Sequence, residues 1–110
     1  MEGRHRRLNR LWHSGSRMAA DLVEKTDRYE RLLANALDAF EITVSPETPL
    51  RDIATEFETM ARSYHEDGRH FLDEDDPVNA LSAFAYGHAW LDAGARLGVF
   101  AVPESELFAA

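Results

Sequence analysis

The run of residues 76–98, DPVNALSAFAYGHAWLDAGARLG, is the feature that most limits how this chain can fold. When its residues are placed at 100° intervals, as in an α-helix, the apolar side chains form two stripes on nearly opposite sides. The first stripe holds Leu81, Phe84, His88, Leu91 and Ala95, and the second holds Ala83, Tyr86, Trp90 and Leu97. A helix that is apolar on two sides needs neighbours on both, so the run predicts the central helix of a bundle.

Between the two stripes, the remaining positions of this helix are small or suited to water. The small residues are Ala80, Gly87, Gly94 and Gly98, and the arc suited to water holds Ser82, Ala89, Asp92, Ala93 and Arg96. Two interpretations of the second stripe are open. Either both stripes are core, or neighbouring helices cover only the first and leave Tyr86, Trp90 and Leu97 as a patch for a partner or a second copy.

An amphipathic helix is expected near the start of the chain, from about residue 19 to about residue 43. Its apolar positions follow a 3.6-residue period and are Leu22, Tyr29, Leu33, Ala36, Leu37 and Phe40. The proline-containing segment VSPETP, residues 44–49, then predicts a turn. Thr48 is expected to cap the following helix, with Pro49 as its first residue.

A second amphipathic helix is expected from Pro49 to about residue 72, with one apolar face and one charged face. Gly68 lies near its end and predicts a bend, because glycine costs about 1 kcal/mol relative to alanine inside a helix. The acidic run DEDD at 73–76 lacks the spacing of a calcium loop. We interpret it instead as the start of the third helix, with Asp76 as the cap and Pro77 in the first turn.

The chain has 110 residues and a formal net charge of -8, and it has no cysteine. This length predicts one domain, and the composition excludes disulfides and cysteine-based metal sites. The basic residues are 11 Arg and only one Lys, Lys25, a bias that points to a salt-loving archaeon. No run is apolar enough for a membrane span or a signal peptide, so a cytoplasmic protein without a membrane partner is expected.

Five arginines precede Met18, namely Arg4, Arg6, Arg7, Arg10 and Arg17, whereas the chain from Met18 onward has 7 basic and 19 acidic residues. The cluster is a basic arm for nucleic acid, or residues 1–17 are a disordered extension, or the natural start is Met18. We favour the extension, because a convincing helix follows Met18 at once. The expected organisation is therefore an extension (1–17), a three-helix bundle (18–102) and a C-terminal tail (103–110).

His88, Asp92 and Arg96 form a polar row along the third helix, at spacings of four residues. A His–Asp pair can orient a general base or a metal-bound imidazole. The sequence has no nucleophile motif or second cluster of ligands to complete such a site, and His65 and His70 are expected to lie too far from His88 to share a metal. We therefore favour a structural pair and expect no catalytic residue, metal or cofactor.

Segment 70–100 resembles the signature of the archaeal domain of unknown function 357 family. The most specific matches are Asn79, Ala80, Leu81, Phe84, Tyr86, His88, Trp90, the residues from Leu91 to Gly94, Arg96, Leu97 and Gly98. The similarity extends back to about Met18 and leaves residues 1–17 outside. It implies an all-α, up-and-down three-helix bundle, and it implies no activity.

The function expected from these observations is a non-enzymatic protein-interaction or self-associating module. Its working surface is the aromatic face of the third helix, with Tyr86, Trp90 and Leu97. Two alternatives stay open. One is a nucleic-acid-associated adaptor that uses the arginine-rich start, and the other is a small hydrolase or metal-binding protein that uses His88 and Asp92.

Overall fold

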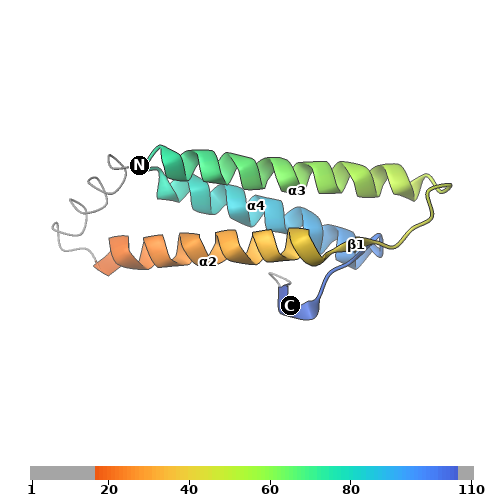
Figure 1. Ribbon diagram of the computed structural model, residues 1–110, viewed down its shortest axis with the longest axis horizontal. Coiled ribbons are helices and arrows are strands. Elements are labelled where there is room, and N and C mark those ends of the chain that lie inside the picture. The colour runs from red at the N-terminus through yellow and green to blue at the C-terminus, as the bar shows by residue number, and fades with distance from the viewer. Residues whose placement is uncertain (1–16, 107–110) are drawn as a thin grey trace.

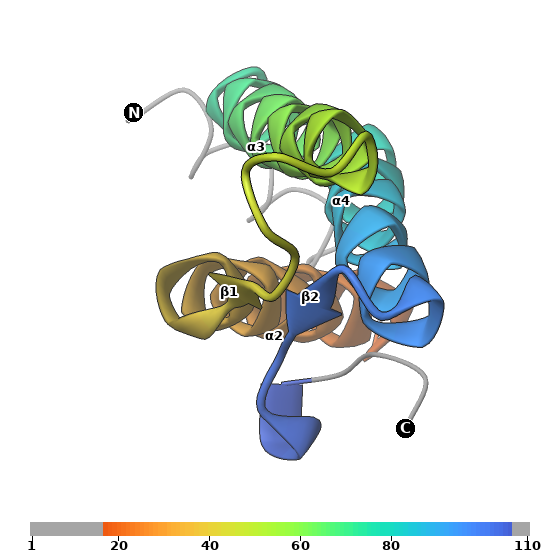
Figure 2. The ribbon, with the colours of Figure 1, turned by 90° about the vertical axis from the view of Figure 1, so that its right-hand side faces the viewer.

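The C-terminal helix, α4 (Pro77–Leu97), packs along both of the other long helices, α2 (Arg17–Ala39) and α3 (Leu50–Asp73). The computed structural model describes the backbone of residues 17–106 and the side chains of residues 20–106. Consecutive helices run in opposite directions (Figure 1). The end-on view in Figure 2 shows α4 beside both neighbours, while α2 and α3 contact each other far less. The predicted all-α, up-and-down three-helix bundle is confirmed, with α4 as its central helix.

The core is formed by apolar side chains from all three helices and from the segment that follows α4. Its buried members are Leu33, Ala36, Leu37, Ala54, Ala61, Ala80, Phe84, Leu91, Val99 and Phe100. The two that α3 contributes are alanines, and short side chains let helix backbones approach closely. Gly87 serves the same purpose on α4, since a Cβ built there would lie 2.9 Å from Leu33 on α2 and 3.1 Å from the Ala61 carbonyl on α3.

Gly68 lies within α3, which is continuous from Leu50 to Asp73. Its role is steric. A Cβ at this position would overlap the ring of Phe84, which is fully buried. The missing side chain therefore makes room for the largest buried residue of α4.

The first helix ends at Ala39, so the prediction that it continues to about residue 43 was wrong. The chain turns instead into strand β1 (Glu41–Ile42), which pairs antiparallel with β2 (Phe100–Ala101), and Ile42 lies opposite Phe100. Thr43 extends the connection, since its backbone N–H donates to the Val99 carbonyl at 2.9 Å and its hydroxyl donates to the Gly98 carbonyl at 2.7 Å. Residues 40–43 and 98–101 thus tie the end of α2 to the end of α4.

The helix starts follow the predicted capping chemistry with one shift. At α4, Asp76 accepts a hydrogen bond from the Asn79 backbone N–H at 3.2 Å and Pro77 is the first helical residue, as expected. At α3, Pro49 is the cap and Leu50 is the first helical residue, so the prediction of Thr48 as the cap was wrong by one position. No side chain caps this start, although the Thr48 hydroxyl accepts a hydrogen bond from the Leu50 N–H at 3.3 Å. Gly98 ends α4 in the left-handed conformation, with φ 90°, that favours glycine.

Residues 1–16, which hold most of the expected basic extension, lie outside the described residues, as do residues 107–110 of the expected tail. The described part of that tail contains a short 3₁₀ helix, η1 (Glu104–Glu106), which lies against α2.

Candidate interaction surface

The members of the polar row of α4, His88, Asp92 and Arg96, differ in burial. His88 is 1% exposed, and its Nδ1 lies 3.3 Å from Oδ1 of Asp92, one helical turn away. Arg96, one turn further, is exposed. Because α4 is covered on two sides, His88 lies in the interior while the end of the row reaches solvent.

Asp92 is buried, at 9% exposure, which corrects its assignment to the arc suited to water. The other four members of that arc, Ser82, Ala89, Ala93 and Arg96, are exposed as expected. On the helical wheel Asp92 lies at the border of this arc, on the side of His88, and its carboxylate contacts that imidazole. Buried polar groups of this kind are normally held by partners within the fold.

The second apolar stripe divides into a covered part and an open part. Ala83 is buried, and Trp90 is half-buried with its ring packed edge-on against Phe57 of α3, at a centroid separation of 5.0 Å. Tyr86 and Leu97 are 61% and 54% exposed. The Tyr86 ring lies 5.7 Å from the ring of Tyr64 on α3, so it rests against the bundle at one edge and faces solvent over most of its surface.

The solvent-facing side of α4 is nearly free of charge. We call its exposed residues the outer face of α4: Val78, Asn79, Ser82, Tyr86, Ala89, Ala93 and Leu97. None of these side chains is charged, and Arg96 is the charged residue that borders them. Since Asp92 is buried, Arg96 is the one exposed charge among the Asp, Glu, Lys and Arg residues of this 21-residue helix.

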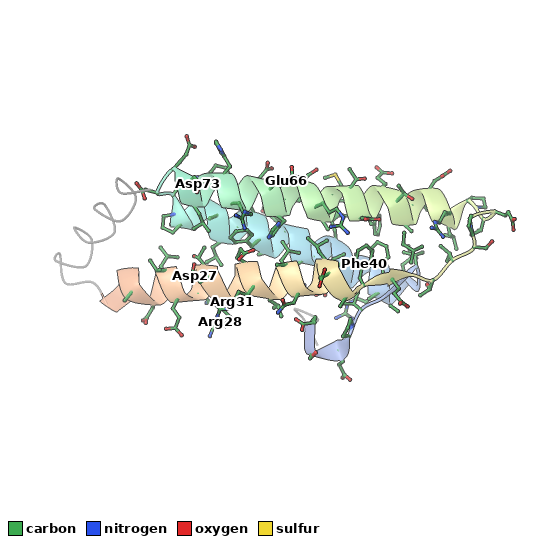
Figure 3. The ribbon with its side chains drawn as sticks, in the orientation of Figure 1. Asp27, Arg28, Arg31, Phe40, Glu66 and Asp73 are labelled. Carbon is green, nitrogen blue, oxygen red and sulfur yellow. The ribbon has the colours of Figure 1, made fainter. Side chains whose placement is uncertain are left out.

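The other two helices present the opposite kind of surface. On α2 the exposed residues include Asp27, Arg28 and Arg31, and on α3 they include Glu66 and Asp73, all labelled in Figure 3. Closely spaced charged side chains keep a helix face solvated and disfavour its association with other proteins. The outer face of α4 also holds three of the five large hydrophobic side chains that are exposed among the described residues, namely Val78, Tyr86 and Leu97.

The other two histidines of the described residues, His65 and His70, are engaged elsewhere. Nε2 of His65 on α3 lies 2.7 Å from Oε2 of Glu30 on α2, a partly buried contact that joins the two helices and that the sequence pattern did not predict. His70 is exposed and pairs with Glu74 at 3.1 Å. Within the described residues, no group of three or more His, Asp or Glu side chains is placed to hold a metal ion.

The model of the family described as "Protein of unknown function (DUF357)" matches residues 28–100. The chain belongs to this family. The DUF357 match spans the second half of α2, all of α3 and α4, and the first residue of β2. It includes the whole outer face of α4, so that face is part of the DUF357 region rather than of an added segment.

No curated protein and no solved structure matches this DUF357 chain. Across the part of the chain that the structure describes, no helix is long and apolar enough to cross a membrane.

Proposed function

We propose that this DUF357 protein is a non-enzymatic protein-interaction module whose working surface is the outer face of α4. The observation that carries the proposal is the exposure of Tyr86 and Leu97, at 61% and 54%, on a face without charged side chains. Isolated exposed apolar residues are common in monomeric proteins. A tyrosine and a leucine gathered with exposed alanines on one uncharged helix face are typical of a contact surface.

The packing beneath this face supports the same function. Trp90 packs edge-on against Phe57, and the Tyr86 ring makes a tilted contact with Tyr64, so both rings already contact the bundle in the free protein. A side chain that is ordered before binding loses less conformational entropy when a partner covers it. Tyrosine and tryptophan are also the residues that most often supply binding energy at protein interfaces.

The polar row favours a structural role over hydrolysis or metal binding. With 1% exposure, the His88 imidazole is covered by the bundle, and its Nδ1 faces Asp92. A general base needs to come within about 3 Å of the proton that it removes, directly or through one water. The nucleic-acid alternative depends on the arginines of residues 1–16, which lie outside the described residues.

The composition indicates the salt conditions under which this function would operate. An acidic chain with 11 Arg and one Lys fits the cytoplasm of a salt-loving archaeon, where high salt screens the net charge of -8. Under those conditions apolar contact contributes more to association than electrostatic steering does. An uncharged helix face can associate by apolar contact under such conditions.

The test compares Tyr86→Glu with Ser63→Glu, a control that adds the same charge at an exposed position of α3. Each purified variant is measured for mass by light scattering over a range of concentrations. Each is also measured for retention of proteins cross-linked to it in its natural cells. We expect Tyr86→Glu alone to reduce self-association or partner retention, with helicity unchanged. Equal behaviour of both variants and the unmodified protein in both measurements would contradict the proposal.

A further inference from the structure

We propose that the outer face of α4 binds the same face of a second copy, with the two α4 helices antiparallel and related by a two-fold axis. This inference rests on the proposed function and names the partner. The exposed positions 79, 82, 86, 89, 93 and 96 are separated alternately by three and four residues, which is the spacing of a coiled-coil seam. In the single chain this seam faces solvent.

The seams of two copies are complementary when the two α4 helices run antiparallel. A two-fold axis midway between positions 87 and 88 brings Tyr86 of one copy opposite Ala89 of the other, and Ser82 opposite Ala93. The bulky ring then meets the smallest side chain on the seam, and this happens twice in the dimer. The same axis brings Val78 opposite Leu97, so the two exposed aliphatic side chains at the ends of the face also meet. Such alternation of large and small residues lets helices pack at the short end of the 8–10 Å range of interaxial distances.

Charge favours this arrangement over other contacts between two copies. From Met18 onward the chain has 7 basic and 19 acidic residues, so most faces of two copies repel each other at low salt. The outer face of α4 avoids that repulsion. The antiparallel arrangement also brings Arg96 of one copy opposite Asn79 of the other, one turn from the acidic residues 73–76. A parallel arrangement would instead bring Arg96 beside Arg96.

The size of the contact predicts a weak dimer. A 21-residue helix is about 32 Å long and about 10 Å wide, which gives a footprint of roughly 300 Å² on each copy. A standard stable interface buries about 800 Å² per partner. We therefore expect association in the high micromolar range, between about 0.1 and 1 mM.

The test uses disulfide cross-linking, which the absence of native cysteine makes specific. The double variant Ser82→Cys with Ala93→Cys is oxidised mildly near the expected dissociation constant, alongside each single variant. Within one chain the two positions lie about 16 Å apart along the helix, too far for an internal disulfide. Across the proposed two-fold axis, position 82 of one copy faces position 93 of the other. Both positions are exposed. Circular dichroism of each variant checks that it is folded.

We expect the double variant to form a covalent dimer at least about tenfold faster than either single variant, since each cysteine of a single variant would lie about 16 Å along the axis from its copy. Equal rates for all three variants would overturn the antiparallel pairing. Monomer mass at every concentration up to about 1 mM, with no cross-linking, would overturn the dimer itself. If Tyr86→Glu still reduced retention of another protein in that case, the proposed function would stand and the self-association would fail.

Discussion

The Phe84 ring of α4 occupies the space at the helix interface where a Cβ of Gly68 on α3 would lie. Phe84 is fully buried and is the largest such side chain in the described protein. The contact between the Gly68 backbone and the Phe84 ring therefore determines the distance between α3 and α4 at this point. Several of the glycines of this chain have the same use, since Gly87 and Gly94 also lie against side chains from other segments.

Gly68→Ala is expected to destabilise the protein. Alanine is favoured over glycine by about 1 kcal/mol inside a helix. Overpacking a core by one methyl group costs about 1–3 kcal/mol, and here the added group overlaps an aromatic ring. Urea denaturation should show a net loss of up to about 2 kcal/mol in the free energy of unfolding. In a Phe84→Leu background the same change should cost less or stabilise. A gain in stability from Gly68→Ala in the unmodified protein would refute this steric account.

Gly94→Ala is expected to open the contact between the ends of α2 and α4. A Cβ at Gly94 would overlap the ring of Phe100, which also packs edge-on against Phe40 at 5.0 Å. Displacing that ring should weaken the adjacent hydrogen bond from the Thr43 N–H to the Val99 carbonyl. Hydrogen exchange at the Thr43 amide should become about tenfold faster, which corresponds to about 1.4 kcal/mol of local stability. The amides in the middle of α3 serve as the internal reference. Unchanged exchange at Thr43 would show that Phe100 does not hold this segment in place.

Asp92→Ala is expected to lower stability because it removes a partner of the buried His88 imidazole. The two side chains approach to 3.3 Å and lie 12% and 1% exposed. Leaving a buried polar group without its partner costs about 1–3 kcal/mol. The control is Asp67→Ala, which removes the same carboxylate from an exposed position of α3 and should change stability by less than about 0.5 kcal/mol. If the two substitutions cost the same in chemical denaturation, the pair would have no structural role.

Potassium chloride is expected to stabilise the protein. The chain carries a net charge of -8, and salt shortens the Debye length from about 10 Å at 0.1 M to about 3 Å at 1 M. Screening of self-repulsion should raise the melting temperature over this range. A variant that removes two nearby exposed charges of α3, Asp52→Asn with Glu56→Gln, should respond less. A melting temperature independent of salt would show that self-repulsion does not limit the stability of the fold.

The local features of the fold were predictable, because the residues that determine them are neighbours in the sequence. Asp76 and Pro77 begin α4 through contacts within one turn, and Gly98 ends it through its own backbone conformation. The order and packing of three helices also followed from apolar periodicity, which reports the side of each helix that needs cover.

Features that depend on distant partners were missed. The end of α2 at Ala39 is determined by pairing between Ile42 and Phe100, which lie 58 positions apart. The run of β-branched residues from Ile42 to Val44 was the available signal, but strands of two residues are too short to show a period. Similarly, nothing near Gly68 in the sequence indicates that Phe84 will fill its space.

The candidate surface was predicted only as one of two alternatives. Both stripes of α4 are apolar, and periodicity alone does not decide which of them a neighbour covers. The structure divides the second stripe, with Trp90 against Phe57 and with Tyr86 and Leu97 exposed. The burial of Asp92 was misjudged for a related reason, since its position on the wheel lies at the border of the exposed arc.

We propose that another protein surface covers the outer face of α4, and hydroxyl-radical footprinting of the unmodified chain measures this cover. Tyr86 and Leu97 would be labelled in dilute protein, in concentrated protein and in an extract of the natural cells. Tyr29, a half-buried tyrosine on α2, provides the reference. We predict that labelling of Tyr86 and Leu97 falls relative to Tyr29 in the concentrated sample, the extract or both. Labelling that stays in the same ratio to Tyr29 under all three conditions would contradict the claim.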